Sequence, residues 1–306
     1  MINWRLWLGL AFVAFLLFIA LFGPSLAPYS TDYAKSFAFV KTAHGTEYMT
    51  PPYPPSSKYW FGTTIAGHDI LTLLLYGAKF TIFTSILVAL ARTVIGGFFG
   101  LSSGVSKYSA REPISLGSLG SFPQFLIVYF FMSSITLNTY LSSFEHSLIE
   151  GLVMVIVGVP GIYSIVQEKT SELNKKQYVE ASVSLGGSKF HLIRKHIIPH
   201  LKGNFIILFV HEIISTLGLL GQLGIFHIFL GGTLYHPQER RPEYKYNTIT
   251  HEWAGLVGHV REYVFGYQWI LIYPLCAVSF TIISFYLVSR GLERRQKETY
   301  QKSPFI

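Results

Sequence analysis

Charged residues are scarce in this sequence of 306 residues, and they are absent from several stretches of about twenty residues. Only 13% of the residues are Asp, Glu, Lys or Arg, whereas soluble domains usually carry about 25%. A helix rises about 1.5 Å per residue, so about 20 apolar residues are needed to cross the hydrocarbon core of a bilayer. The scarcity of charge therefore predicts an all-α integral membrane protein and excludes an ordinary soluble domain.

Cysteine and the common catalytic motifs are also nearly absent. The single cysteine, Cys276, excludes an internal disulfide and argues against a cysteine-based metal site. The sequences "HEIIS" at His211 and "HEWAG" at His251 lack the second histidine of an H-E-x-x-H zinc motif. The sequence "GGSKF" at 186–190 lacks the order and spacing of a phosphate-binding loop. We therefore expect no metal site, and we expect ATP, if it drives this protein, to bind another chain.

One apparent catalytic motif has a simpler explanation. The sequence "GLSSG" at 100–104 fits the G-x-S-x-G pattern, but that motif acts on a turn between a strand and a helix. Together with Gly96 it places glycine at every fourth position, and such spacing lets membrane helices approach closely. We interpret Gly96, Gly100 and Gly104 as a helix-packing face.

Six apolar runs are long enough to be membrane spans, and two of them contain a charge. Arg92 interrupts the second run and Glu212 lies in the fifth. The runs cover residues 6–27, 80–104, 121–141, 151–167, 204–230 and 267–289. This order predicts a first helix and outer segment over 1–79, a membrane domain over 80–290 and a tail over 291–306.

The distribution of Lys and Arg predicts how the chain is oriented. If the N-terminus is cytoplasmic, the inner segments hold 15 basic and 6 acidic residues, and the outer segments hold 8 and 9. Cytoplasmic loops carry such an excess of Lys and Arg, so both termini are expected in the cytoplasm and the net charge of +8 needs no nucleic-acid partner. The long outer segments 28–79 and 231–266 either contact a partner or gate the entrance, or they form a packed cap over the spans.

One inner segment, 168–203, combines basic charge with strong helix signals. Within its sequence "YVEASVSLGGSKFHLIRKHIIPH", Gly186 can end a helix at positive φ, and Ser188 can cap the next one. Pro199 ends that second helix or begins the following element. The apolar stripe in 190–197 is compatible with a helix lying on anionic lipid or with a helix contacting another protein.

The residues of this segment resemble the EAA loop of ABC importer permeases. The order is Glu180-Ala181-Ser182, three residues, Gly186, nine residues, and then "HIIP" at 196–199. This spacing resembles the form found in the oligopeptide/dipeptide/nickel group of permeases, with Ser182 for the second alanine and Ile198 for leucine.

Two further stretches resemble the same group. The sequence "FGTTIAGHDILTLLLYGAKF" at 61–80 is similar to an outer segment of the family, with Thr64 and His68 where the family has Asp and Arg. The sequence at 157–181 is similar to the exit of the fourth span, although Ser164 and Gln167 replace two basic residues. The insert 231–266 departs from the family.

The resemblance implies the C-type permease subunit of an ATP-driven importer for peptides or a related small solute. It implies six spans in the bacterial plasma membrane, no catalytic residue, and no cofactor in this chain, with ATP and Mg bound by partner ATPases. The implied partners are a second permease forming a heterodimer, two cytoplasmic ATPase subunits, an extracytoplasmic binding protein and membrane lipid. The residues implied in ATPase coupling are Tyr178, Glu180, Ala181, Ser182, Leu185, Gly186, His196 and Pro199.

The intramembrane charges suggest a second site. Arg92 and Glu212 lie about 18 Å and about 12 Å from the cytoplasmic ends of their runs, within reach of each other. We expect a direct pair beside the translocation path together with Gln222, or else contact with the membrane surface or with the second permease. A secondary carrier, or an intramembrane enzyme using His211 and Glu212, is the alternative function.

Overall fold

The computed structural model describes residues 3–35, 37–42, 45–105, 123–138, 140–235, 246–260 and 265–302. The longest helices are α1 (Trp4–Leu26), α2 (Ile70–Gly104), α5 (Ser143–Asn174), α8 (Ile198–Ile225) and α10 (Gln268–Lys302). The shorter helices are α4 (Gln124–Ser133), α6 (Gln177–Ser184), α7 (Lys189–Leu192), the π-helical turn η2 (Ile193–Ile197) and α9 (Trp253–Val260). Four short strands complete the list, namely β1 (Ala38–Thr42), β2 (Gly45–Met49), β3 (Thr233–Tyr235) and β4 (Tyr246–Thr248).

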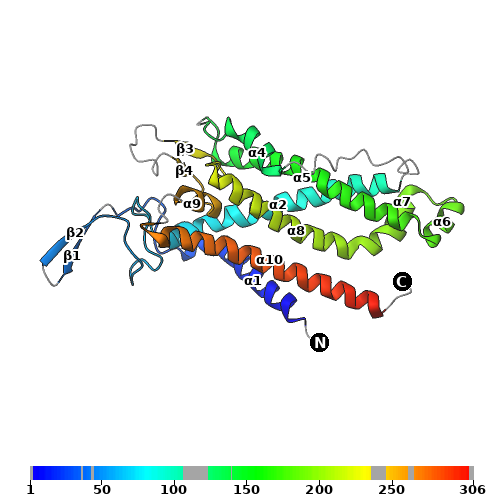
Figure 1. Cartoon of the computed structure of the whole chain (residues 1–306), viewed down its shortest axis with the longest axis horizontal. Helices are drawn as coiled ribbons and strands as arrows, with labels where there is room; N and C mark the ends of the chain where they lie inside the picture. Colours follow the sequence, from blue (N-terminus) through cyan, green and yellow to red (C-terminus); the bar gives the residue numbers. More distant parts are fainter. Residues whose placement is uncertain are drawn as a thin grey trace.

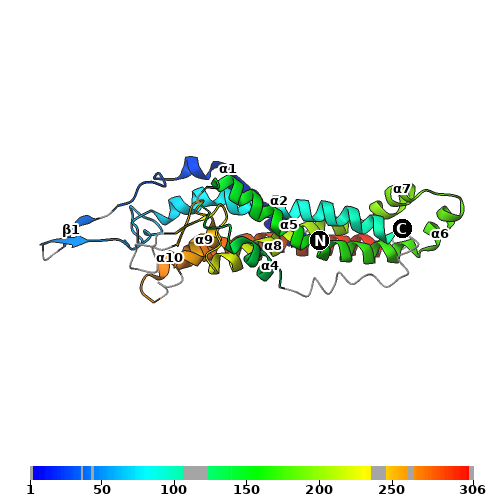
Figure 2. The same ribbon diagram turned by 90° about the horizontal axis from the view of Figure 1, so that it is seen from above.

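The long helices form an elongated bundle with different features at its two ends (Figure 1). One end carries α9 and the two antiparallel hairpins β1–β2 and β3–β4. The other end carries α6 and α7, and both termini lie toward it (Figure 2). The termini therefore lie on the same side of the bundle as the predicted coupling segment.

Five helices in the described part of the chain are long and apolar enough to cross a membrane. They cover Trp4–Leu26, Ile70–Gly104, Ser143–Asn174, Lys189–Ile225 and Gln268–Glu298. Each of these extends beyond at least one end of the apolar run that predicted it, because the flanking residues continue the helix. The all-α membrane fold is confirmed, with two small hairpins added in the outer segments.

The predicted third span, 121–141, is shorter in the structure than the sequence indicates, so the count of six spans is not confirmed. Helix α4 has 10 residues and is about 15 Å long, half the thickness of the hydrocarbon core. Pro123 precedes it, and the chain turns after Ser133, where the Thr136 N–H donates to the Met132 carbonyl at 2.8 Å. The Thr136 hydroxyl also pairs with that of Thr233 at 3.0 Å, a tertiary contact that ends the helix early. Most of the inner segment 105–120 lies outside the described residues.

The glycines at every fourth position pack α2 against α5, as their spacing predicts. A Cβ added at Gly96 would lie 2.6 Å from Ile162, at Gly100 2.8 Å from Val166, and at Gly104 2.5 Å from Thr170. The contacted side chains also recur at every fourth position, so two helical ridges run alongside each other with their backbones close. In a bilayer the hydrophobic effect does not drive helices together, so their association depends on close packing, which small residues allow.

Part of the outer insert 231–266 is a packed cap. Helix α9 lies in this insert, and the Trp253 indole N–H donates to the Leu74 carbonyl on α2 at 2.8 Å. Trp253 and Leu256 join a core cluster with residues of α1, α2 and α10. Residues 236–245 of the insert lie outside the described part of the chain.

We predict opposite effects for two matched Gly→Ala substitutions. Gly100→Ala forces a Cβ into Val166 and the Tyr163 carbonyl and should destabilise the protein by about 1–3 kcal/mol. Gly161→Ala on α5 meets no atom within 4 Å and should be neutral or stabilising by about 0.5–1 kcal/mol. Midpoints of thermal unfolding in detergent measure both. Equal midpoints for the two variants would show that the glycine face does not hold α2 and α5 together.

Candidate functional site

The predicted coupling segment is a helix, a glycine turn and a second helix at one end of the bundle (Figures 1 and 2). Helix α6 ends where Gly186 adopts a φ of +83°, as its sequence predicts. The Gly187 N–H donates to the Ser182 carbonyl and the Gly186 N–H to the Val183 carbonyl, both at 3.0 Å. These two bonds form a Schellman motif, which satisfies the last carbonyls of the helix.

The second half of the segment leads directly into a membrane span. The Ser188 hydroxyl accepts a hydrogen bond from the His191 N–H at 3.2 Å, which confirms the predicted N-cap of α7. The π-helical turn η2 then joins α7 to α8, and Pro199 lies in the first turn of α8. N–H groups in the first turn of a helix have no partner within the helix, so a proline at this position does not interrupt it. The range from Lys189 to Ile225 is therefore one candidate span.

A small apolar core fixes the segment to the bundle. Val179 of α6, Leu192 of α7 and Ile197 of η2 are buried together with Leu201 of α8 and Val105. Ile193 packs against the same cluster, so most of the apolar stripe in 190–197 faces protein. It does not form a continuous lipid-facing surface. This arrangement favours the protein-contact interpretation of the segment.

The outer face of the segment exposes apolar side chains. Leu185 is 90% exposed and Phe190 is 70% exposed, with Glu180 and Ala181 also on the surface. Phe190 and His200 were not among the predicted site residues, although both belong to the same basic stretch. Two sequence signals could have identified them. His200 lies four residues, or about one helical turn, after His196, and Phe190 lies at the start of the apolar stripe in 190–197.

Tyr178 and His196, both predicted coupling residues, lie together. The Tyr178 ring lies 6.1 Å from His196 and stacks on His200 at 5.6 Å between centroids. The His200 ring nitrogen also lies 2.7 Å from the His196 carbonyl. These contacts link α6 to the first turn of α8 across the segment.

The two intramembrane charges form an ion pair. The Arg92 Nη1 lies 3.1 Å from the Glu212 Oε2, and the Arg92 side chain is fully buried. Arg92 Nε and Nη2 also donate to the Met154 carbonyl of α5 at 3.0 and 2.7 Å. One guanidinium therefore joins α2, α5 and α8, and the direct pair expected from helix depth is present in the structure.

Gly158 makes room for this guanidinium. A Cβ added at Gly158 would overlap the Arg92 guanidinium. The next turn of α5 contains Pro160, which lacks the N–H of a normal helical bond. The sequence pattern did not single out Gly158, because the need for it arises from a side chain of another helix.

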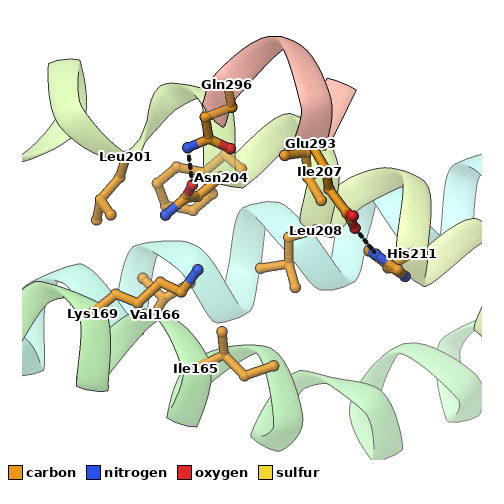
Figure 3. Close-up of a pocket in the computed structure, with 11 residues that line it drawn as sticks. Ile165, Val166, Lys169, Leu201, Asn204, Ile207, Leu208, His211, Glu293 and Gln296 are labelled. Atoms are coloured by element: carbon orange, nitrogen blue, oxygen red, sulfur yellow. Dashed lines mark hydrogen bonds and ion pairs between the residues drawn. The ribbon is translucent and has the colours of Figure 1, made fainter. Parts of the chain in front are cut away.

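A pocket of about 330 Å³ lies between α5, α8 and α10 (Figure 3). Two polar contacts cross from α8 to α10 beside it, one from Asn204 to Gln296 and one from His211 to Glu293 at 3.4 Å. His211 also lies 3.0 Å from the Ser289 hydroxyl. The pocket is lined by Ile165, Val166, Lys169, Leu201, Asn204, Phe205, Ile207, Leu208, His211, Glu293 and Gln296.

His211 and Glu212 do not act as a pair. His211 contacts Ser289 and Glu293 on α10, whereas Glu212 contacts Arg92 on α2. Neighbouring residues on a helix point about 100° apart, which explains why these two side chains have different partners. The arrangement gives no support to an intramembrane enzyme built on these two groups.

One face of α8 is open and polar. His211 and Gln222 are exposed, Ser215 lies between them, and a Cβ added at Gly218 would meet nothing within 4 Å. These residues recur at spacings of three or four, so they share one helix face. In a membrane, such a polar face contacts another protein chain or a water-filled path.

These features define a multi-pass helical membrane protein with an exposed helix–glycine–helix segment joined directly to one of its spans. A sequence profile of the family described as "Binding-protein-dependent transport system inner membrane component" matches residues 4–298, and the chain belongs to this family. It is thus a multi-pass inner-membrane permease of an ABC transporter.

Curated proteins with similar sequences are also described as permeases of transport systems. The chain is 24% identical over 299 residues to the "Dipeptide transport system permease protein DppC" of Bacillus subtilis, covering 93% of this chain and 79% of that protein. It is 28% identical over 222 residues to the "Oligopeptide transport system permease protein OppC" of the same organism, covering 71% and 66%. It is 27% identical over 286 residues to the "Peptide transport system permease protein SapC" of Haemophilus influenzae, covering 91% and 85%.

The family is one of non-catalytic transport subunits without cofactors, and ATP is hydrolysed by separate chains. Its members work with an ATPase and a binding protein. Membership therefore overturns the alternatives of an intramembrane enzyme and of a secondary carrier.

We predict that breaking the ion pair from either side is costly. Arg92→Leu leaves Glu212 without a cation and should destabilise the protein by about 3–5 kcal/mol, as should Glu212→Leu. The double variant, with both charges removed, should be clearly milder than the sum. Thermal unfolding midpoints of all four proteins form the double-mutant cycle.

The hydrogen bonds to Met154 limit how much stability a charge swap can restore. In Arg92→Glu with Glu212→Arg, the pair is restored, but the two hydrogen bonds to the Met154 carbonyl are lost. We expect partial recovery of stability relative to either single swap. If the losses of stability simply add in the leucine variants and in the charge-swap variants, the pair does not link the helices.

Proposed function

We propose that the chain is one of two permease subunits of an ATP-driven importer and that it carries peptides or a related small solute inward. The observation that carries the proposal is the helix pair α6–α7, which exposes Glu180, Ala181 and Leu185 and continues into a membrane span. A surface of this kind fits a cleft in a cytoplasmic ATPase. The orientation with both termini in the cytoplasm belongs to the same proposal, because it places α6 and α7 on the side where ATP is available.

The coupling residues have different roles in this proposal. Ala181 and Ser182 allow close approach of the ATPase, Glu180 supplies a polar contact, and Leu185 supplies an apolar one. Gly186 sets the turn through its positive φ. Tyr178, His196 and Pro199 join the segment to α8, so these three residues transmit the movement rather than contact the ATPase.

Movement of the segment is passed on as a rigid body. The buried cluster around Val179 and Ile197 joins α6, α7 and η2 to the first turns of α8. Helix α8 carries Glu212, which is tied to α2 and α5 through Arg92. Displacement of α6 by the ATPase then tilts α8 relative to its neighbours, and such helix rocking opens the path alternately to each side.

The translocation path lies along the open face of α8 in this proposal. Gln222 and Ser215 face it directly, and Glu212 is partly exposed toward it. Arg92 is fully buried and contributes through Glu212. Packing this face of α8 against the matching helix of a second, non-identical permease subunit encloses the path between the two chains.

The proposed class of solute is inferred from the descriptions of the curated relatives. The curated proteins named above are described as permeases for dipeptides, oligopeptides and peptides, and we extend this class to the present chain. Thr64, His68, Ser164 and Gln167 depart from the family pattern, as does the insert 231–266. Ser164 and Gln167 lie at the inner exit of their span, so we place the difference in solute or binding protein in Thr64, His68 and the insert, with 28–79 and 231–266 receiving the extracytoplasmic binding protein.

The function is tested by purifying the chain from its native membrane and measuring ATP hydrolysis. We expect a second permease and two ATPase subunits to co-purify, and hydrolysis to rise when a peptide-loaded binding protein is added in proteoliposomes. Dipeptides, longer peptides and a nickel complex are compared at equal concentration. Stimulation by nickel alone would reject the peptide class, and failure of any ATPase to co-purify would reject the coupling assignment.

We predict a specific defect from two substitutions in the coupling segment. Ala181→Trp should lower transport and ATPase binding at least about tenfold, since about 1.4 kcal/mol of lost contact has that effect. Ala181→Ser, which keeps the side chain small, should act like the native protein. Both variants should insert into the membrane normally, because Ala181 is exposed and does not contribute to the buried cluster.

Gly186 provides a second matched pair. A Cβ at Gly186 would meet nothing within 4 Å, so any defect of Gly186→Val comes from the backbone at φ +83°. A β-branched residue there is strained by about 1–3 kcal/mol, whereas Gly186→Asn should be tolerated. Transport per ATP hydrolysed is the measurement. Equal transport per ATP hydrolysed in the valine and asparagine variants would show that the conformation of this turn has no role in coupling.

A further inference from the structure

Two carboxyl side chains are buried at the outer end of the bundle. Glu150 of α5 is 0% exposed, and Glu252, directly before α9, is 1% exposed. Ile149, next to Glu150, and Ala254, two residues after Glu252, pack in the same apolar cluster, so the two carboxyls lie in the same region of the structure. They come from a membrane span and from the outer insert, so they lie where the insert is held against the spans.

The two carboxyls differ in their hydrogen bonds. Glu252 Oε2 accepts from the Ala254 N–H at 2.7 Å, and the N–H groups of Gly255 and Leu230 also donate to this carboxyl. Within the described residues, neither oxygen of Glu150 has a partner, and the same holds for His146 Nδ1 and Thr248 Oγ1. Glu150 is thus a fully buried acid without a donor.

The charged and titratable groups nearby do not neutralise Glu150. Arg92 of α2 contacts Met154, one turn further along α5 than Glu150, and it is already paired with Glu212. On α5, the other ring nitrogen of His146 lies 2.9 Å from the Asn138 carbonyl. At the end of α8, His227 stacks on Tyr246 at 4.5 Å between centroids.

His251, next to Glu252, is also no cationic partner. Burial lowers the pKa of His251 to about 4, and the neighbouring His68 lowers it further, while Asp32 acts in the opposite direction. His251 is therefore neutral at neutral pH. A carboxylate without a cation or a donor is strongly unfavourable in such a place.

The docking of α9 depends on very close backbone contacts. A Cβ at Gly224 would lie 2.5 Å from the Ala254 carbonyl, and Cβ atoms at Gly77 and Gly258 would overlap the His251 and Gly224 carbonyls. These contacts join α9 and the residue before it to α8 and α2 and tolerate little movement, so repulsion between two ionised carboxyls would disturb the docking of α9.

We propose that Glu150 and Glu252 form a proton-binding carboxyl pair that holds the start of the outer cap, directly before α9, against the spans, and that loss of the proton releases this cap. A proton held by Glu150 supplies the missing donor and lets one carboxyl bond to the other. The site takes a proton and does not need a metal ion. Acid therefore closes the outer entrance, and alkali loosens it.

The direction of the pH dependence follows from linkage. Burial raises the pKa of Glu252 from 4.5 to about 7. The docked state therefore binds more protons than the undocked state between these two pH values, so docking weakens as pH rises from about 4.5 to about 7. Below this range docking is strongest.

The test measures access to α9 as a function of pH in membranes that contain the full chain and its partner subunits. Cys276 is replaced by Ser, and a single cysteine is placed at Leu256, which is buried on α9. A second protein carries the cysteine at the fully exposed Phe265, which corrects for the pH dependence of thiol chemistry. A membrane-impermeant maleimide is added from outside, and the ratio of the two labelling rates is compared.

We expect the ratio to rise at least about tenfold from about pH 5 to about pH 8. Glu252→Gln and Glu150→Gln keep the shape of the carboxyl and should each reduce this rise, and the double variant should abolish it. Glu145→Gln, at an exposed position on the same helix that accepts glutamine in its capping box, should leave the rise unchanged.

Three results would overturn the proposal. The ratio in the otherwise native protein could stay flat, the double variant could retain the full rise, or the ratio could follow sodium or calcium concentration at constant pH. The last result would assign the pair to a metal ion instead of a proton. Because labelling needs neither ATP nor a solute, its outcome is independent of the proposed transport function.

Discussion

The buried guanidinium of Arg92 is the interaction on which the arrangement of the spans depends. A charge at the centre of a bilayer costs at least about 2.5–3.5 kcal/mol, so this side chain needs partners that are already in place. Met154 supplies a carbonyl from α5 and Glu212 supplies a carboxylate from α8. Three helices must therefore be in register before the charge is satisfied. Gly158 is the structural condition for this, because any larger residue would occupy the space of the guanidinium.

Close packing by glycine serves both ends of the molecule. On the inner side, Gly96, Gly100 and Gly104 bring α2 and α5 together with almost no space for adjustment. On the outer side, Gly77 and Gly224 do the same for α9. Interfaces packed this closely move as units rather than deform. Under the proposed coupling, movement of α6 would reach a path about 20–30 Å away along α8, and rigid packing suits that transmission.

Buried charge is handled differently near the middle of the bundle and at the end that carries α9. Arg92 meets a carboxylate, so the two buried charges balance each other. Glu150 meets a second acid, so it needs a proton. The first arrangement holds the bundle permanently together, and the second makes the docking of the outer insert conditional. A permanent link near the middle and a conditional one at the entrance are both compatible with alternating access.

Much of the molecule could be predicted from the sequence because the signals are local. Apolar runs predicted five of the spans, glycine spacing predicted the α2–α5 interface, and Gly186 and Ser188 predicted the turn and the cap between α6 and α7. Each of these depends on helical periodicity or on backbone conformation within a few residues. The depth of Arg92 and Glu212 along their helices was also enough to suggest that they pair.

Other features depended on contacts between distant segments. The short α4 ends where Thr136 meets Thr233, and no local pattern contains that contact. The same is true of Gly158, whose neighbour is a side chain from α2, and of Glu150, whose neighbour is the outer insert. The sequence by itself determined a membrane permease and the helix–glycine–helix structure of α6 and α7, since helix and turn propensities act locally. Only the tertiary structure decided which buried charges have partners, since burial and pairing arise when helices from distant parts of the chain pack together.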